Sequence, residues 1–369
     1  MNAPRASETS PPASPPVATA PPELSVVVVC ERGLTGMAAT LAALTAQTAA
    51  DRIELIAVGP DDARMDPGAL PPNHQRLGAL RLLRLPAVTH VDHDLAPGVH
   101  AATAPVVALI EDHAFPEPAW AERTLAAWHA VGPGVAAIGF GVTNANPRSG
   151  FSWANMLLAY GRWMPADQGA AEAEAPDTDT GLPQAAAGPT PVAWVAAHNV
   201  SLRRAALDPL LPRLGELTGR EGLFLRELRG GGHAFAHAVD ARIAHVNPST
   251  PWATAKLRTD AGRLYGARRA DEGGWGFGRR LAYVLLSPAI APLRFVRERA
   301  THFGGGQRAA LTPRVYPALY AALQCDALGQ ALGYALGAGG APGRLATFEM
   351  DRARHVDAAD RRACFGPQT

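Results

Sequence analysis

The sequence predicts an α/β fold in which a mixed sheet is flanked by helices and followed by a helical C-terminal segment. Three features predict it. Short apolar runs rich in β-branched residues recur along the chain, stretches of good helix formers separate them, and acidic residues follow one run directly. Strands that are covered on both faces of a sheet are continuously apolar, so these runs are typical of buried strands.

The composition is that of a folded protein without a strong overall charge. The chain has 369 residues, 47% of them hydrophobic, which suffices for one large domain with an appendage or for two modest domains. Lys and Arg number 34 against 33 Asp and Glu, so the net charge of +1 gives no general attraction for nucleic acid. Cys30, Cys325 and Cys364 are too far apart for a close-spaced zinc motif, and they fit a reducing compartment.

The first half of the chain begins with a β-α-β unit. Residues 24–30 and 53–58 are predicted strands, and residues 37–47 between them predict a helix. Three further elements follow, namely a short strand at 81–85, a short helix at 98–104 and a strand at 105–110.

The second half continues the alternation of strands and helices. Four elements are predicted, namely a helix at 120–129, a strand at 134–142, a helix at 220–229 and strands within 234–245. The Ala-, Pro- and Gly-rich stretch 167–191 predicts a surface loop.

These elements divide the chain into regions of different composition. We expect a disordered Pro- and Ala-rich tail over residues 1–23, because it has too little apolar surface to fold. An α/β domain is expected over 24–250, a helical region over 251–345 and a second tail over 346–369.

Glu111, Asp112 and His113 follow the predicted strand at 105–110 directly. Open α/β sheets bind ligands beyond the carboxyl ends of their strands, so this position favours a chemical role for the three side chains. The alternative for the two acids is a solvated turn, and the alternative for His113 is a local hydrogen bond.

The order of elements and four short motifs resemble glycosyltransferase family 2. The motifs are LSVVVVCERG, VVALIEDHAFPEPAW, AAHNVSLRRAAL and REGLFLRELRGGGH. The resemblance covers about residues 24–299. It implies a GT-A fold, which is a Rossmann-like mixed sheet flanked by helices, and an enzyme that transfers a sugar from a nucleotide-activated donor.

The resemblance also implies a site for a UDP- or GDP-linked sugar. Its residues, matched through the motifs, would be Val28, Cys30, Glu31, Arg32, Asp61, Asp62, Glu111, His198 and Asn199. The acids after the second strand come two residues later than the family pattern, because Gly59 and Pro60 precede them.

A divalent metal ion and a catalytic base are implied in the same way. Glu111, Asp112 and His113, with His245, would hold Mg²⁺ or Mn²⁺, although the family norm at this motif is Asp-any-Asp. A hard cation there would stabilise the leaving diphosphate. Glu221 would take the proton of the acceptor hydroxyl in an inverting transfer.

Other interpretations of these residues stay open. Glu221 could be an ordinary acid in the first turn of a helix, and His245 a histidine satisfied within its strand. The altered motifs would also suit a catalytically silent protein that keeps the fold as a binding or scaffold protein of an envelope-glycan pathway. Metal-dependent turnover of nucleotide sugars would separate the enzyme from the scaffold.

Two apolar stretches lie near the C-terminus, at residues 281–296 and 315–336. The first spans only about sixteen residues, contains Pro288 and Pro292, and is edged by arginines, so it is too short to span a bilayer. It suits a helix in the membrane interface, with a buried core helix as the alternative. From the resemblance we expect a protein on the cytoplasmic face of the cell membrane, peripheral or re-entrant, acting on a lipid-linked or cell-envelope glycan in polysaccharide biosynthesis.

Overall fold

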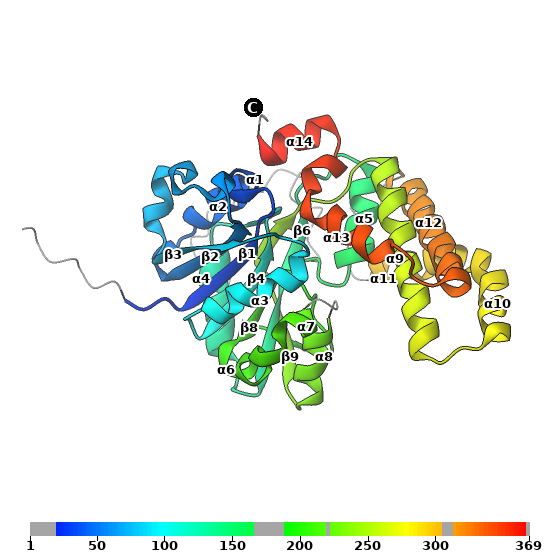
Figure 1. Ribbon diagram of the computed structural model, residues 1–369, viewed down its shortest axis with the longest axis horizontal. Helices are drawn as coiled ribbons and strands as arrows, with labels where there is room; N and C mark the ends of the chain where they lie inside the picture. The colour runs from blue at the N-terminus through cyan, green and yellow to red at the C-terminus, as the bar shows by residue number, and fades with distance from the viewer. Residues whose placement is uncertain (1–19, 166–187, 219–221, 305–312, 367–369) are drawn as a thin grey trace, which may run out of the picture.

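A computed structural model describes residues 20–165, 188–218, 222–304 and 313–366 of the chain. Its centre is a mixed sheet with the strand order β3-β2-β1-β4-β8-β6-β9-β5, and β7 pairs with β9 (Figure 1). The strands are β1 Leu24–Val29, β2 Ile53–Pro60, β3 Ala79–Leu85, β4 Val106–Glu111, β5 Ala114–Pro116, β6 Val135–Asn144, β7 Thr190–Val192, β8 Val200–Arg203 and β9 Ala234–His245.

Helices cover both faces of the sheet and then continue into a C-terminal helical segment (Figure 1). The helices around the sheet are α1 Gly33–Gly36, α2 Ala38–Thr45, α3 Val91–Ala101, α4 Trp120–Ala130, α5 Gly150–Tyr160, α6 Arg204–Leu207, α7 Leu214–Thr218 and α8 Leu223–Gly230. The later helices are α9 Pro251–Glu272, α10 Phe277–Leu286, α11 Ile290–Gly304, α12 Val315–Leu336, α13 Ala341–Met350 and α14 Ala358–Phe365. The predicted α/β class is therefore confirmed.

The continuous apolar run of β1 is explained by its position between β2 and β4, both parallel to it. Successive side chains of a strand point to opposite faces of the sheet. Val26 and Val28 pack into the core that contains α2 and α4, whereas Val27 and Val29 pack into the core that contains α3 and α8. Burial on both faces leaves no place for a polar side chain in the second half of this strand.

Two predicted helix starts are wrong. The helix expected at 98–104 is α3, which already begins at Val91, because Asp94 Oδ2 accepts hydrogen bonds from the backbone N–H groups of Thr89 and His90 and fixes the first turn. The helix expected at 220–229 is α8, which begins only at Leu223. Gly222, directly before it, has a left-handed φ of 73°, which is not an α-helical conformation.

Two other expectations need smaller corrections. Residues 234–245 form one strand, β9, rather than several. The apolar stretch 281–296 is not one helix, because Pro288 lies in a short 3₁₀ turn, Ser287–Ala289, that separates α10 from α11. Among the described residues, no helix has both the length and the apolar character needed to cross a bilayer.

The C-terminal segment is built on the pair α9 and α12, whose backbones touch at glycines. A Cβ atom added at Gly262 would lie 2.2 Å from the carbonyl oxygen of Asp326, and one at Gly329 would lie 2.1 Å from that of Thr259. Such contacts let two helices approach more closely than side chains would allow.

We therefore expect Gly329→Ala to lower the free energy of unfolding by about 1–3 kcal/mol, because the added methyl group forces the two backbones apart. The matched control is Gly278→Ala in α10, where an added Cβ meets nothing within 4 Å. Chemical denaturation of both variants measures the effect. Equal stability of the two variants would contradict the close packing of α9 and α12.

Candidate active site

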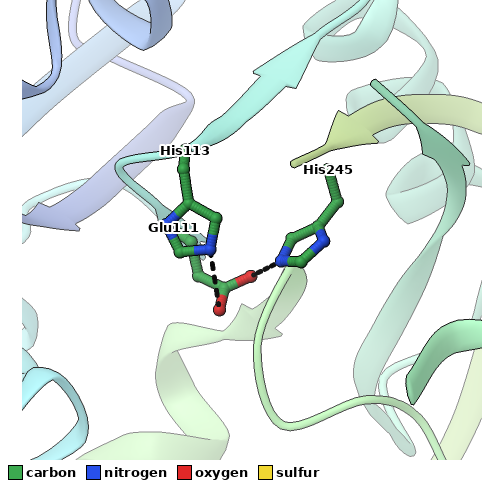
Figure 2. Close-up of side chains that lie close together, drawn as sticks. All are labelled: Glu111, His113 and His245. Carbon is green, nitrogen blue, oxygen red and sulfur yellow. Dashed lines mark ion pairs between the residues drawn. The ribbon is translucent and has the colours of Figure 1, made fainter. Parts of the chain in front are cut away.

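Three side chains that could hold a metal ion meet at the carboxyl edge of the sheet (Figure 2). Glu111 is the last residue of β4, His113 follows it, and His245 is the last residue of β9. The short strand β5 brings the histidines together, because Ala114 pairs with His245 and leaves the two imidazole centroids 4.9 Å apart. The ligand atoms of the three residues lie within 4.8 Å of one another.

Glu111 is buried and bonded as a carboxylate. Its Oε2 accepts hydrogen bonds from Asn199 Nδ2 at 2.6 Å and from the Tyr160 hydroxyl at 3.0 Å, and it lies 3.1 Å from His245 Nε2. Burial alone would raise the pKa of Glu111, but the facing histidines hold that pKa well below its usual range. The same burial and the Glu111 charge raise the pKa of Tyr160 well above its usual value, so Tyr160 stays a donor.

His113 lies between Asp112, Arg352 and Glu111. Arg352 Nε donates to His113 Nε2 at 3.2 Å, so the ring proton of His113 lies on Nδ1, which is 2.8 Å from Asp112 Oδ1. Burial, together with the Arg352 guanidinium, lowers the pKa of His113 to about 3, which keeps the ring neutral. Nε2 also lies 3.7 Å from Glu111 Oε1.

His245 is oriented in the same way. Asn247 Nδ2 donates to Asn144 Oδ1 and to the backbone oxygen of His245, which leaves Asn247 Oδ1 to accept from His245 Nδ1 at 3.1 Å. The Nε2 atom faces the Glu111 carboxylate at 3.1 Å and has no hydrogen-bond partner among the described residues. Either a proton on Nε2 or a cation between Nε2 and the carboxylate oxygen would stabilise this arrangement.

The donor set fits a divalent metal ion. A metal-bound histidine usually donates its other ring N–H to a carboxylate or amide oxygen, and here Asp112 and Asn247 accept these bonds. Glu111 is 8% exposed and the Asp112 side chain 14%, so the interpretation of these two acids as a solvated turn is wrong.

Asp112 lies beside the three residues and faces His113 rather than Glu111. Its backbone oxygen accepts a hydrogen bond from the Thr40 hydroxyl at 2.6 Å, which fixes the turn after β4. Burial, with Glu111 nearby, raises the pKa of Asp112 to about 8. In this geometry the Asp112 side chain orients the imidazole of His113.

The cluster opens into a cleft of about 1450 Å³ between the sheet and the C-terminal helices. Glu111, Asp112, His113 and His245 line one end of it, and His198 lies on the same wall. Glu221, the expected base, lies outside the described residues. Leu223 and Arg226, from the helix that follows it, line this cleft.

The residues expected to hold the nucleotide lie in different environments. The side chains of Val28 and Cys30 are fully buried in the core, and burial raises the pKa of the Cys30 thiol. Glu31, Asp61 and Asp62 lie beyond the ends of β1 and β2, and they lie outside the lining of the large cleft.

Arginine side chains connect these strand ends to one another and to the C-terminal segment. Arg64 bridges Glu31 and Asp62 at 3.1 and 2.7 Å, and Arg84 lies 3.8 Å from Asp61. Arg32 forms an ion pair with Asp351 at 3.5 Å, next to Arg352. Asn199, with a left-handed φ of 54°, is held against Glu111 as described above.

Several residues of the site could not be recognised as site residues from the sequence. Tyr160 at the end of α5, Asn247 after β9 and Arg352 in the 3₁₀ turn Arg352–His355 reach the cluster from distant parts of the chain. Arg352 is 5% exposed and also forms an ion pair with Glu349. The strand order and the fold of the C-terminal segment are needed to find these residues.

Replacing Arg352 by Met should raise the affinity for Mn²⁺ by about three- to tenfold, because it removes a positive charge and frees the His113 lone pair. Isothermal titration with MnCl₂ measures the change. Arg354→Met is the matched control, since the Arg354 side chain is 82% exposed and pairs with Asp351. Weaker Mn²⁺ binding by Arg352→Met would show that this arginine supports the ligands instead.

The chain is similar to several solved structures of other proteins. No protein-family model matches the chain, and no curated protein matches it. The mannosyltransferase PcManGT from Pyrobaculum calidifontis, solved with GDP-Man and Mn²⁺, is 16% identical at a TM-score of 0.49, covering 86% of this chain and 90% of that one. TarS from S. aureus is 11% identical at a TM-score of 0.43, over 66% of this chain and 40% of that one.

A shorter form of TarS, residues 1–349, is 12% identical in a complex with UDP, at a TM-score of 0.44 over 85% of this chain and 92% of that one. These structural neighbours are glycosyltransferases. This chain spans only two-fifths of the full TarS chain. At these identities and TM-scores the likeness assigns neither a family nor a substrate to this chain.

Proposed function

We propose that this chain is an inverting, metal-assisted family 2 glycosyltransferase that moves a sugar from a UDP- or GDP-linked donor to a hydroxyl of a lipid-linked or cell-envelope glycan. The observation that carries the proposal is the buried Glu111 carboxylate, which two imidazole Nε2 atoms face at one end of a large cleft. This cluster lies where open α/β sheets bind their ligands.

The donor atoms favour Mn²⁺ over Mg²⁺. Two imidazole nitrogens and one carboxylate suit a transition metal, whereas Mg²⁺ prefers oxygen ligands and bound water. A divalent ion held by Glu111, His113 and His245 would neutralise the charge that develops on the leaving diphosphate.

The chain's own residues would do the remaining work. Asp112 and Asn247 bond Nδ1 of the two imidazoles and so hold both Nε2 atoms towards Glu111, and Tyr160 and Asn199 fix the Glu111 carboxylate. Glu221 is the proposed base, and it would accept the proton of the acceptor hydroxyl as the new glycosidic bond forms. Glu31, Arg32, Asp61 and Asp62 are proposed to contact the nucleotide.

We further propose that α10 and α11 lie on the cytoplasmic face of the cell membrane. Their exposed side chains support this, because Phe277 is 80%, Leu285 70%, Leu293 70% and Val296 67% exposed. Apolar residues flanked by arginines suit the interface between headgroups and acyl chains.

The experiment is an assay of sugar release and transfer with a panel of UDP- and GDP-sugars, with Mn²⁺ and with a chelator. The proposal predicts turnover that the chelator abolishes and that Asp112→Asn and Glu221→Gln strongly reduce. Nucleotide binding without turnover would instead support the catalytically silent scaffold.

A further inference from the structure

The cleft runs along one face of α9. The side chains of α9 that line it recur every three to four residues, as expected for one helical face, and they are Leu257, Arg258, Ala261, Leu264, Tyr265, Arg268, Arg269 and Glu272. Arg258 lies at the inner end, where its Nε donates a hydrogen bond to Asn155 Oδ1 and where it interacts electrostatically with Glu349 and Arg352. At 1.5 Å per residue, Arg268 lies about 15 Å further along the helix axis.

The outer end of the cleft is rich in arginine. The guanidinium carbons of Arg269 and Arg279 lie 5.2 and 4.4 Å from the centroid of the Trp275 ring. Arg268 and Arg226 line the same cleft. Within the part of the chain that the structure describes, none of these four arginines forms an ion pair with a carboxylate, and Glu272 is the acid that lines this end.

The helix α10 carries an exposed apolar surface as well as one of these arginines. Phe277, Leu281, Leu285 and Leu286 of α10 are 80%, 44%, 70% and 64% exposed, and α10 also carries Arg279. A ligand with an anionic group at Arg279 could therefore place an apolar chain against α10.

We propose that the outer end of the cleft is a second subsite, which binds the phosphate group of an acceptor carried on an apolar chain. Guanidinium groups recognise phosphate through paired, charge-assisted hydrogen bonds, and stacking on Trp275 holds two of them in place. The role of this subsite in sugar transfer depends on the proposed function. The subsite makes that function more specific, because an acceptor bound there would place its phosphate at the arginine-rich end of the cleft and its reacting hydroxyl near Glu111.

The test is binding of farnesyl monophosphate, with farnesol and inorganic phosphate as comparison ligands, measured by isothermal titration of the full chain. Wild type is expected to bind farnesyl monophosphate at least about tenfold more tightly than either comparison ligand. The variant Arg268→Gln/Arg269→Gln/Arg279→Gln should lose at least about tenfold in affinity. Arg268→Gln alone, on an exposed side chain without an ion pair, keeps the test valid if the triple variant unfolds.

The control is Arg297→Gln in α11, whose side chain is 68% exposed and is absent from the cleft lining. Equal loss in this control would mean diffuse attraction to anionic headgroups and would overturn the subsite. Equal affinity for farnesol would overturn the phosphate contact, and equal affinity for inorganic phosphate would overturn the role of the apolar chain.

Titration of the same proteins with UDP and GDP in the presence of Mn²⁺ separates the two proposals. Failure of wild type to bind either nucleotide counts against the proposed function and leaves farnesyl monophosphate binding as evidence for the subsite. If wild type binds a nucleotide but does not prefer farnesyl monophosphate to the comparison ligands, the proposed function keeps its support and the subsite is overturned.

Discussion

Replacing His245 by Ala is expected to weaken Mn²⁺ binding by at least about 100-fold, because loss of a mere orienting partner of a metal ligand already costs ten- to a hundredfold. His245 Nε2 lies 3.1 Å from Glu111 Oε2 and faces the carboxylate. No other described nitrogen in the cluster can replace it, since His113 faces the opposite carboxylate oxygen.

The measurement is a titration of the metal-free protein with MnCl₂, followed by the electron paramagnetic resonance signal of free Mn²⁺. His233→Ala is the control, because His233 precedes the same strand and lies outside the cleft lining. Unchanged Mn²⁺ affinity in His245→Ala would mean that His245 is only a satisfied strand histidine.

The second large effect concerns Glu111. Glu111→Gln keeps the shape of the side chain and removes the negative charge that a bound metal ion would require. Loss of about 4 kcal/mol of transition-state stabilisation corresponds to roughly a thousandfold lower kcat. Steady-state transfer with a nucleotide sugar that wild type accepts measures this effect.

Two controls isolate the charge effect. Glu117→Gln changes an acid close in sequence that lies outside the cleft lining, and it should leave kcat unchanged. Thermal unfolding of Glu111→Gln verifies that the variant is folded. A folded Glu111→Gln variant with wild-type kcat would exclude metal-assisted departure of the diphosphate.

The fold was largely predictable because its central strands are buried on both faces. Such strands, for example β1 and β4, show continuous apolar runs that few other structures produce. Helix starts were less predictable, since the start of α3 depends on hydrogen bonds from Thr89 and His90 to Asp94 and that of α8 on the conformation of Gly222.

The candidate site was predictable only where its residues follow a strand directly. Glu111 and His113 do so, and their position at the strand end pointed to the carboxyl edge of the sheet. Tyr160, Asn247 and Arg352 come from segments up to about 240 residues away, so only the folded chain brings them together. The tautomers of the two histidines likewise depend on tertiary contacts.

The most direct test of the central claim is a crystal structure of the protein soaked with Mn²⁺ and a nucleoside diphosphate, with anomalous scattering used to locate the metal. The account predicts one strong peak bonded to Glu111, His113 and His245, beside the diphosphate. A peak elsewhere, or a diphosphate bound in the cleft with no metal at these three residues, would contradict it.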